Sequence, residues 1–217
     1  MKRKLEKISL RQKKFASLKL KILECLMEKI ESKTLEEVSV KEIAQELEIS
    51  EMTFYNYFKN KKELIIYFIE LWNIEMNQVL LNTKTLSSIE AIFLIYKLTA
   101  IKIESNYRFM MEIIAFIALN GTPKKDLHIT DAEIILRFGS LFSFQEGGFK
   151  ELLLPLLNSA IKNKEIKSRD TQTLFIALHN TFFGTPLFVD AKSVGELQTL
   201  YKKQLVNILD MKGKMDV

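Results

Sequence analysis

Residues 49–65 read ISEMTFYNYFKNKKELI, and four aromatic side chains fall within five positions of this stretch. They are Phe54, Tyr55, Tyr57 and Phe58. A helix buries only one stripe of its surface, so the four rings cannot all lie in one core. Phe54 and Phe58 stand four residues apart and share a face. We therefore expect the phenylalanines to be buried and the tyrosines to face a partner that accepts hydrogen bonds.

Two short helices are predicted on either side of a tight turn at this point. Ser39 and Glu42 form a capping-box pattern at the start of SVKEIAQEL. Ser50 is a suitable N-cap for a second helix after a three-residue break. With the phenylalanines inward, the second helix displays polar and aromatic groups, which is typical of a helix-turn-helix. The displayed side chains are Thr53, Tyr55, Asn56 and Tyr57.

Longer helices are predicted before and after this pair. The spacing of apolar residues from Phe15 to Ile30 indicates a helix over about 10–30. Asn60 caps a second long helix that runs to about Leu81, with Lys61 in its first turn. The unsatisfied backbone N–H groups at such an end suit a phosphate.

The rest of the chain also favours helices, since 217 residues contain only seven glycines and three prolines. The sequence therefore predicts an all-α protein of about nine or ten helices. Further helices are expected near 86–104, 107–119, 130–143, 149–163, 171–188 and 195–211.

The net charge of +5 is unevenly distributed. Residues 1–21 hold nine basic side chains and one acidic, whereas residues 22–58 hold three basic and nine acidic. A basic end on a body of low net charge is expected where one end meets a polyanion. The acidic residues of 22–58 would be repelled by a polyanion. DNA binding would therefore depend on the basic N-terminal arm and on KNKK at 59–62. The arm residues are Lys2, Arg3, Lys4, Lys7, Arg11, Lys13 and Lys14, which a solvated terminus would also explain.

The segment SVKEIAQELEISEMTFYNYFKNKKELI (39–65) resembles the DNA-binding segment of the TetR/AcrR family of transcriptional regulators. With the first helix, the resemblance covers about residues 10–82. Met52 departs from the common form, because the family often has glycine at this position. The matching positions are Ser39, Val40, Ile43-Ala44, Ile49-Ser50, Thr53 to Phe58, and Lys61.

The resemblance implies a homodimer that places one helix-turn-helix per subunit in the major groove of a palindromic operator. Asn56 is then the best candidate to read adenine, and Glu51 suits the amino group of cytosine. Tyr57 and Lys61 would hold phosphates. The predicted DNA-binding residues are Ser39, Ser50, Glu51, Met52, Thr53, Tyr55, Asn56, Tyr57 and Lys61.

The resemblance also implies a domain division, with the basic arm and helix-turn-helix at 1–60 and a helical effector-binding and dimerisation domain at 61–217. Aromatic and thioether side chains in the second part suit a small apolar or amphipathic effector, although most such residues serve as core. Glu112 and His179 stand among apolar neighbours and need polar partners. The candidate effector residues are Phe93, Tyr96, Tyr107, Met111, Glu112, Phe116, Phe138, Phe142, Phe175, His179 and Phe182.

The last two predicted helices suggest the dimer contact, because small residues and a three/four apolar spacing would suit a four-helix bundle between two subunits. A monomeric core could use the same residues. The candidate interface residues are Leu174, Ala177, Leu178, Thr181, Thr185, Leu197, Leu200, Tyr201, Leu205 and Ile208.

Catalytic and metal chemistry find little support. Two histidines and one cysteine offer no metal-ligand spacing, and no phosphate loop or nucleophile motif is found. We expect no enzyme activity, no cofactor and no metal. Cys25 lies on the apolar stripe of the first helix and is predicted to be a buried thiol. Neither a signal peptide nor a membrane span is predicted, which favours a cytoplasmic protein.

These features predict a transcriptional repressor that a small molecule releases from DNA. Two alternatives stay open. One is a helical small-molecule-binding protein with a vestigial helix-turn-helix, and the other is a transcriptional activator on the same fold. The sequence does not identify the operator, the effector or the regulated genes.

Overall fold

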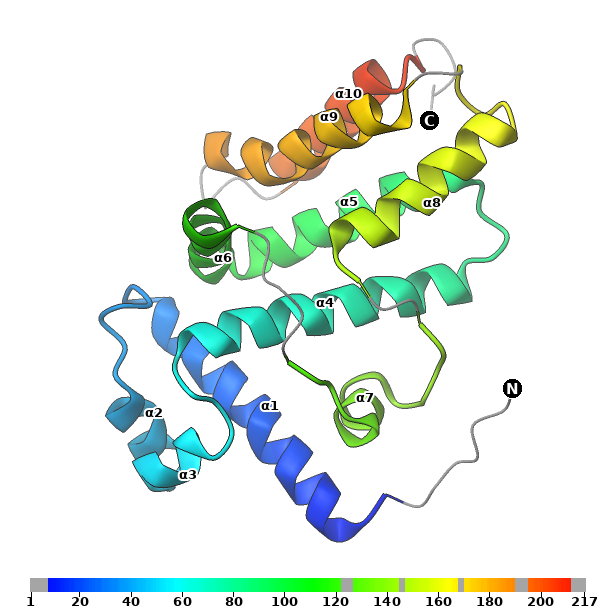
Figure 1. The fold of residues 1–217 in the computed structure, drawn as a ribbon. Helices are drawn as coiled ribbons and strands as arrows, with labels where there is room; N and C mark the ends of the chain where they lie inside the picture. Colours follow the sequence, from blue (N-terminus) through cyan, green and yellow to red (C-terminus); the bar gives the residue numbers. More distant parts are fainter. Residues whose placement is uncertain (1–7, 122–126, 145–146, 168–169, 190–194, 212–217) are drawn as a thin grey trace. The chain divides into compact units, whose positions relative to one another are not determined.

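The computed structural model describes residues 8–121, 127–144, 147–167, 170–189 and 195–211 (Figure 1). Within these ranges the chain forms ten α-helices, one short 3₁₀ helix and no strand, which confirms the all-α prediction. Lys2, Arg3, Lys4 and Lys7 of the predicted arm lie outside the described residues. The helices are α1 (Leu10–Ile30), α2 (Val40–Glu46), α3 (Glu51–Tyr55), α4 (Lys62–Asn82), α5 (Ser88–Ser105), α6 (Tyr107–Asn120), α7 (Asp131–Phe138), α8 (Phe149–Lys162), α9 (Thr171–Gly184), η1 (Thr185–Phe188) and α10 (Glu196–Ile208).

Two predicted helices were too long. The helix expected at 130–143 ends at Phe138, because Gly139 adopts a left-handed conformation at φ 80° and terminates it. The helix expected at 171–188 changes at Gly184 into the 3₁₀ helix η1, where Pro186 has no N–H to continue the α-helical pattern.

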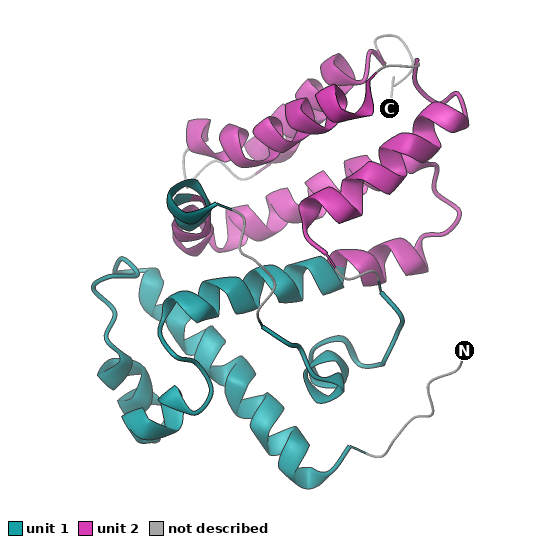
Figure 2. Cartoon of the chain, in the orientation of Figure 1, with its two compact units in different colours: residues 1–75, 115–144 teal, residues 76–114, 145–217 magenta. Residues whose placement is uncertain are grey.

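The described chain divides into two compact units, each built from separated segments (Figure 2). Unit 1 comprises residues 1–75 and 115–144, and unit 2 comprises residues 76–114 and 145–217. α4 and α6 each have residues in both units. The boundary predicted at residue 60 separates a DNA-binding part from an effector-binding part, whereas the two units are defined by packing. The functional boundary therefore stays a prediction.

The core of unit 1 is apolar and joins the first four helices. Ile22 and Leu26 of α1, Ile43 of α2 and Phe54 of α3 are fully buried. Cys25 is buried as predicted, and burial raises the pKa of its thiol. α7 also packs against α1 in this unit.

A buried ion pair connects α1 with α7. The ammonium of Lys19 lies 3.0 Å from a carboxylate oxygen of Glu133, and Glu133 has no solvent exposure. The same ammonium lies 4.5 Å from the ring centre of Tyr67 and 5.6 Å from that of Phe58, within cation–π range. The other oxygen of Glu133 accepts bonds from the backbone N–H (2.9 Å) and hydroxyl (2.6 Å) of Thr130. Burial and then the Glu133 carboxylate raise the pKa of Tyr67 well above its usual range.

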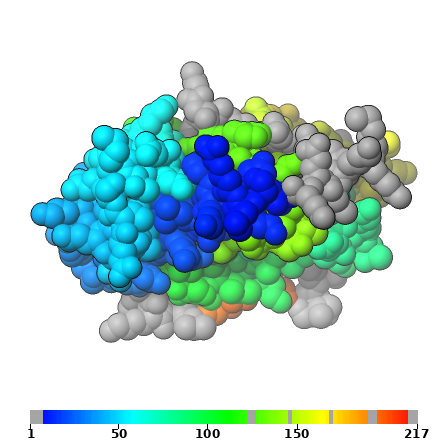
Figure 3. Space-filling view, turned by 90° about the horizontal axis from the view of Figure 1, so that it is seen from below, coloured from blue at the N-terminus to red at the C-terminus, as the bar shows by residue number. Residues whose placement is uncertain are grey.

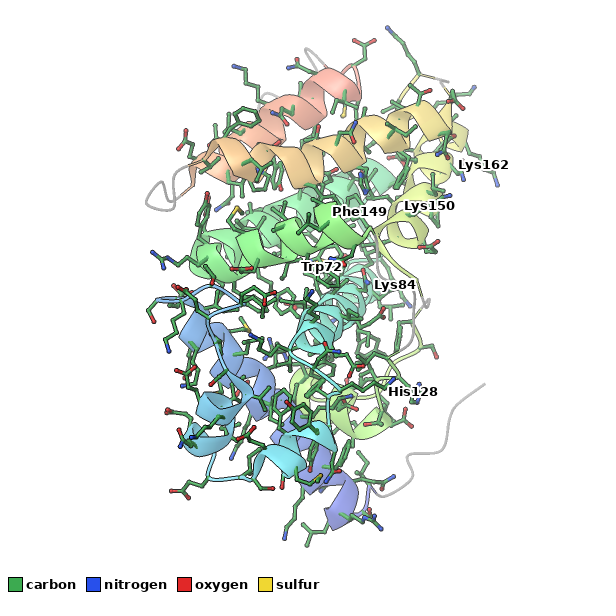
Figure 4. All side chains as sticks on the ribbon, turned by 60° about the vertical axis from the view of Figure 1, so that its left-hand side comes forward. Trp72, Lys84, His128, Phe149, Lys150 and Lys162 are labelled. Carbon is green, nitrogen blue, oxygen red and sulfur yellow. The ribbon has the colours of Figure 1, made fainter. Side chains whose placement is uncertain are left out.

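Unit 2 is centred on an aromatic cluster. In it, α10 packs against α5 and α9, and α8 packs against the same two helices. The rings of Phe149 and Phe182 lie 4.1 Å apart, and Phe149 is labelled at the start of α8 in Figure 4. The hydroxyls of Tyr96 and Tyr201 donate to the carbonyls of Leu178 (2.8 Å) and Phe182 (2.6 Å). Both buried phenols are therefore satisfied by α9.

By length and composition, α4 is the one helix among the described residues that could cross a membrane. Half of the most apolar 18-residue stretch of α4 is buried inside the protein. Leu64, Ile65 and Phe68 pack in unit 1, where they cover its core.

Breaking the buried pair should destabilise unit 1. We expect Lys19→Met to lower the free energy of unfolding by about 3–5 kcal/mol, because it leaves a buried carboxylate unpaired. Urea unfolding followed by the fluorescence of Trp72, the only tryptophan, measures this (Figure 4). Adding Glu133→Gln to that variant should restore most of the loss, because glutamine keeps the capping bond to Thr130 without the charge. The exposed Lys21→Met serves as control, and a double variant as unstable as the single one would contradict this account.

Candidate nucleic-acid interface

The turn between α2 and α3 is fixed by backbone hydrogen bonds. The N–H of Glu48 donates to the carbonyl of Gln45 (3.2 Å) and that of Ile49 to the carbonyl of Ala44 (2.9 Å). These two bonds form a Schellman motif, with Glu48 in the left-handed conformation at φ 53°. A residue with a Cβ pays about 1 kcal/mol for this conformation. The turn geometry of a helix-turn-helix is thus present, with strain at one residue.

α3 has a buried inner face and an exposed outer face. Phe54 on α3 and Phe58 just beyond it are buried, as predicted. The outer face consists of Glu51, Met52, Tyr55 and Asn56, all exposed. Met52 is 71% exposed and Tyr55 is 49% exposed. Their positions, at i, i+1, i+4 and i+5, place them on one side of the helix. This outer face is the surface that a nucleic acid could contact.

Three of the predicted contact residues use their hydroxyls within the protein. The hydroxyl of Ser39 accepts from the N–H of Glu42 (3.1 Å), and the carboxylate of Glu42 accepts from the N–H of Ser39 (2.9 Å). The hydroxyl of Ser50 accepts from the N–H of Thr53 (3.0 Å), and the two hydroxyls lie 2.8 Å apart. Ser39 and Ser50 thus begin the two helices, and Thr53 lies in the first turn of α3. Their direct contact with DNA stays a prediction.

Tyr57 is positioned by an aromatic neighbour. Its ring stacks on that of Phe15 of α1, with centres 4.3 Å apart and planes 21° apart. Burial raises the pKa of Tyr57, so its hydroxyl keeps a proton to donate. Phe15 begins the apolar spacing of the first helix, yet it is 41% exposed and covers the ring of Tyr57.

Lys61 makes hydrogen bonds within the protein, and its predicted phosphate contact stays a prediction. Its ammonium donates to the backbone carbonyls of Leu35 (2.6 Å), Glu36 (3.0 Å) and Val38 (2.5 Å). An ammonium has three protons, and these three bonds use all of them. In this structure Lys61 therefore connects the segment before α2 to the start of α4.

Other cations surround α3 without lying on it. The start of α1, in dark blue, and the region of α2 and α3, in lighter blue to cyan, appear on one face in Figure 3. Arg11, Lys13 and Lys14 are exposed at the start of α1, as are Lys41 in α2 and Lys59 after α3. The sequence has no Lys or Arg between positions 42 and 58. Phosphate contacts would therefore come from the flanks of the outer face.

The candidate effector residues are divided between the two compact units, and their role stays a prediction. Phe116, Phe138 and Phe142 belong to unit 1, and the others belong to unit 2. A groove of about 460 Å³ between α5 and α10 in unit 2 includes only Phe93 and Tyr96 of the set. Its other lining residues are Leu86, Glu90, Leu94, Lys97, Gln198, Thr199, Tyr201, Lys202 and Leu205.

Several of these candidates are core residues of unit 2. Tyr96, Phe175 and Phe182 are buried in the aromatic cluster. The ring of His179 lies 5.7 Å from that of Phe175 and 4.8 Å from that of Phe183, and burial lowers its pKa. Tyr107 donates to the carbonyl of Val189 (3.0 Å). Met111 and Glu112 are partly exposed.

Most of the predicted dimer residues are used inside the subunit. Six of them are buried where α9, η1 and α10 pack within unit 2: Leu174, Leu178, Thr185, Leu197, Tyr201 and Leu205. Ala177, Thr181, Leu200 and Ile208 keep partial exposure. Sequence reasoning missed the exposed apolar residues of this region, which are Ile176, Leu187 and Phe188.

No three His, Cys, Asp or Glu side chains are grouped to hold a metal ion in the part of the chain that the structure describes. Sequence reasoning also missed the Lys19–Glu133 pair. A lysine within an apolar stripe was the one signal that could have indicated it.

The role of Lys61 can be separated from phosphate binding. We expect Lys61→Met to lower the free energy of unfolding by about 2–3 kcal/mol, because three carbonyls lose a charged donor. The neighbouring exposed Lys62→Met should leave it nearly unchanged. Urea unfolding compares the two. Lys61→Met could instead be as stable as the unchanged protein and show a salt slope of DNA binding reduced by about one. That result would indicate a phosphate contact.

Comparison with known proteins agrees with this geometry. Residues 22–68 match the family model described as bacterial regulatory proteins, tetR family. These residues contain α2, α3 and the turn between them. No curated protein matches the sequence.

Solved structures share the fold across most of the chain. A TetR family regulator, PfmR from Thermus thermophilus, is 18% identical with a TM-score of 0.59, covering 87% of this chain and 97% of its own. FadR from Bacillus subtilis, in complex with stearoyl-CoA, is 19% identical with a TM-score of 0.57, covering 88% and 97%. FadR from Thermus thermophilus, in complex with lauroyl-CoA, is 16% identical with a TM-score of 0.57, covering 92% and 96%.

The family match thus covers the helix-turn-helix, and the three solved structures share the fold over most of the chain. In residues 22–68 the chain is similar to the tetR family of bacterial regulatory proteins.

Proposed function

We propose that this protein is a repressor that binds a palindromic operator as a homodimer and is released by an amphipathic small molecule. The exposed outer face of α3, in the family-matched segment, is the observation that supports DNA binding most directly. A regulator of this kind acts where the DNA is, so we place it in the cytoplasm. We assign it no enzymatic step.

In the proposed complex, the outer face of α3 enters the major groove. Tyr55 and Asn56 contact base edges or sugars, and Tyr57 donates to a phosphate. Arg11, Lys13 and Lys14 at the start of α1 supply positive charge beside the groove. Two subunits then read half-sites separated by about 34–36 Å or a multiple of it.

The proposed dimer contact consists of exposed apolar residues of α9 and η1. Ile176, Leu187 and Phe188 are large apolar residues exposed there, and Phe188 is 86% exposed. Ala177 and Gly184 of α9 are small and partly exposed, which allows a partner helix to approach closely. A two-fold contact of this surface with its copy would cover it.

For the effector we propose a long-chain acyl thioester. Two structures of similar fold hold stearoyl-CoA and lauroyl-CoA, which supports this class. The groove between α5 and α10 is the site we propose, because Phe93 and Leu94 offer apolar surface beside the ammonium of Lys97. Apolar walls with few polar groups are usual for such ligands.

Sequence-dependent DNA binding is the first expected outcome. Duplexes selected from a random-sequence library by the purified protein should bind tightly in fluorescence anisotropy, compared with scrambled duplexes at two salt concentrations. Tyr57→Phe keeps the stack on Phe15 but loses the phosphate bond, so binding should weaken about tenfold with an unchanged salt slope.

A charge-matched pair of double variants serves as control. Lys13→Ala with Lys14→Ala should reduce the salt slope, whereas Lys150→Ala with Lys162→Ala on α8 should not (Figure 4). Failure to enrich any duplex would contradict the proposal and favour a vestigial helix-turn-helix. Transcription that rises on operator binding in a reconstituted assay would identify an activator.

Release by acyl-CoA is the second expected outcome. Lauroyl-CoA and stearoyl-CoA should dissociate the selected duplex in the anisotropy assay, and free CoA should not, because it lacks the apolar chain. Phe93→Ala should weaken the response several-fold, and Ile101→Ala, an exposed position on the same helix, should leave it unchanged. Release by free CoA as well would rule out recognition of the chain.

A further inference from the structure

The outer face of α3 has no cationic side chain, and this limits the bases that it can read. Arg and Lys make the commonest specific contact in the major groove, a paired bond to guanine O6 and N7. The outer face offers one carboxylate, one thioether, one phenol and one amide. The nearest Lys or Arg in the sequence are Lys41 and Lys59. α3 therefore lacks the side chains that most often read guanine.

Met52 is the most exposed large apolar side chain of α3. It is 71% exposed, in the first turn of the helix, where recognition helices meet base edges. The C5-methyl group of thymine is the apolar group that a base pair presents in the major groove. A thioether side chain of three flexible bonds can cover such a methyl group. Thymine is the base whose chemistry fits this position.

Glu51 and Asn56 on either side of Met52 agree with this reading. The carboxylate of Glu51 is repelled by phosphates and accepts from an exocyclic amino group of cytosine or adenine. Asn56 pairs with adenine through N6 and N7. The hydroxyls of Ser50 and Thr53 lie within hydrogen-bond distance of each other, so they are engaged within the protein. The outer face thus combines groups for thymine methyl and for amino-bearing bases.

We infer that Met52 is a specificity-determining residue that covers the C5-methyl group of one thymine in each operator half-site. This inference rests on the proposed function, because it concerns the same face of α3. It goes further in stating the base and the atom that the helix reads.

The experiment replaces single thymines in the selected duplex with deoxyuridine, which lacks only the methyl group. One thymine per half-site should show a loss of affinity of about fourfold for the unchanged protein, as expected for one buried methyl group. Met52→Ala should bind the thymine and deoxyuridine duplexes equally. Met52→Leu, which keeps an apolar side chain, should retain the preference. Ile101→Ala should behave as the unchanged protein.

The outcomes separate this inference from the proposed function. A selected duplex that binds tightly, but in which no thymine shows a methyl effect that depends on Met52, would overturn the inference and leave the regulator intact. The inference would also be overturned if the selected duplexes required a guanine and Met52→Ala lost the preference for that guanine. Failure to select any duplex would overturn both.

Discussion

The packing of unit 1 depends on one buried interaction, the ion pair between the ammonium of Lys19 and the carboxylate of Glu133. A buried charge needs its partner, so α7 must pack against α1 although the two side chains lie 114 positions apart in the sequence. The rings of Phe58 and Tyr67 complete the enclosure. The ring of Phe58 also neighbours that of Phe54 in α3. The packing of α7 and the support of α3 therefore share one cluster of side chains. This explains why unit 1 includes residues from the middle of the chain.

The helix-turn-helix itself depends on short-range interactions. Ser39 and Ser50 begin the two helices, and a Schellman turn with Glu48 in an unfavourable conformation sets the angle between them. Lys61 then fastens the preceding segment through three carbonyls. Several polar groups of the motif thus make hydrogen bonds within the protein. The outer face of α3 and the hydroxyl of Tyr57 are the groups that we propose for DNA recognition.

The features that the sequence predicted well are local ones. Capping boxes and apolar spacing gave the helices to within a few residues, and the i, i+4 spacing of Phe54 and Phe58 gave the buried side of α3. Features that depend on distant partners were not predictable in this way. Phe15 lies on an apolar stripe, yet it covers Tyr57. Leu197 and Tyr201 follow a spacing that suits a dimer as well as a core, and only the packed structure places them in the core.

The two faces of α3 have a consequence for how such a protein could evolve. Phe54 and Phe58 hold the helix in place from within, while the four outer side chains make few contacts with the rest of the fold. Substitutions at the outer positions would therefore cost little folding stability. Descendants of this chain could acquire new surface chemistry by point mutation there, without repacking any core residue and without disturbing unit 2.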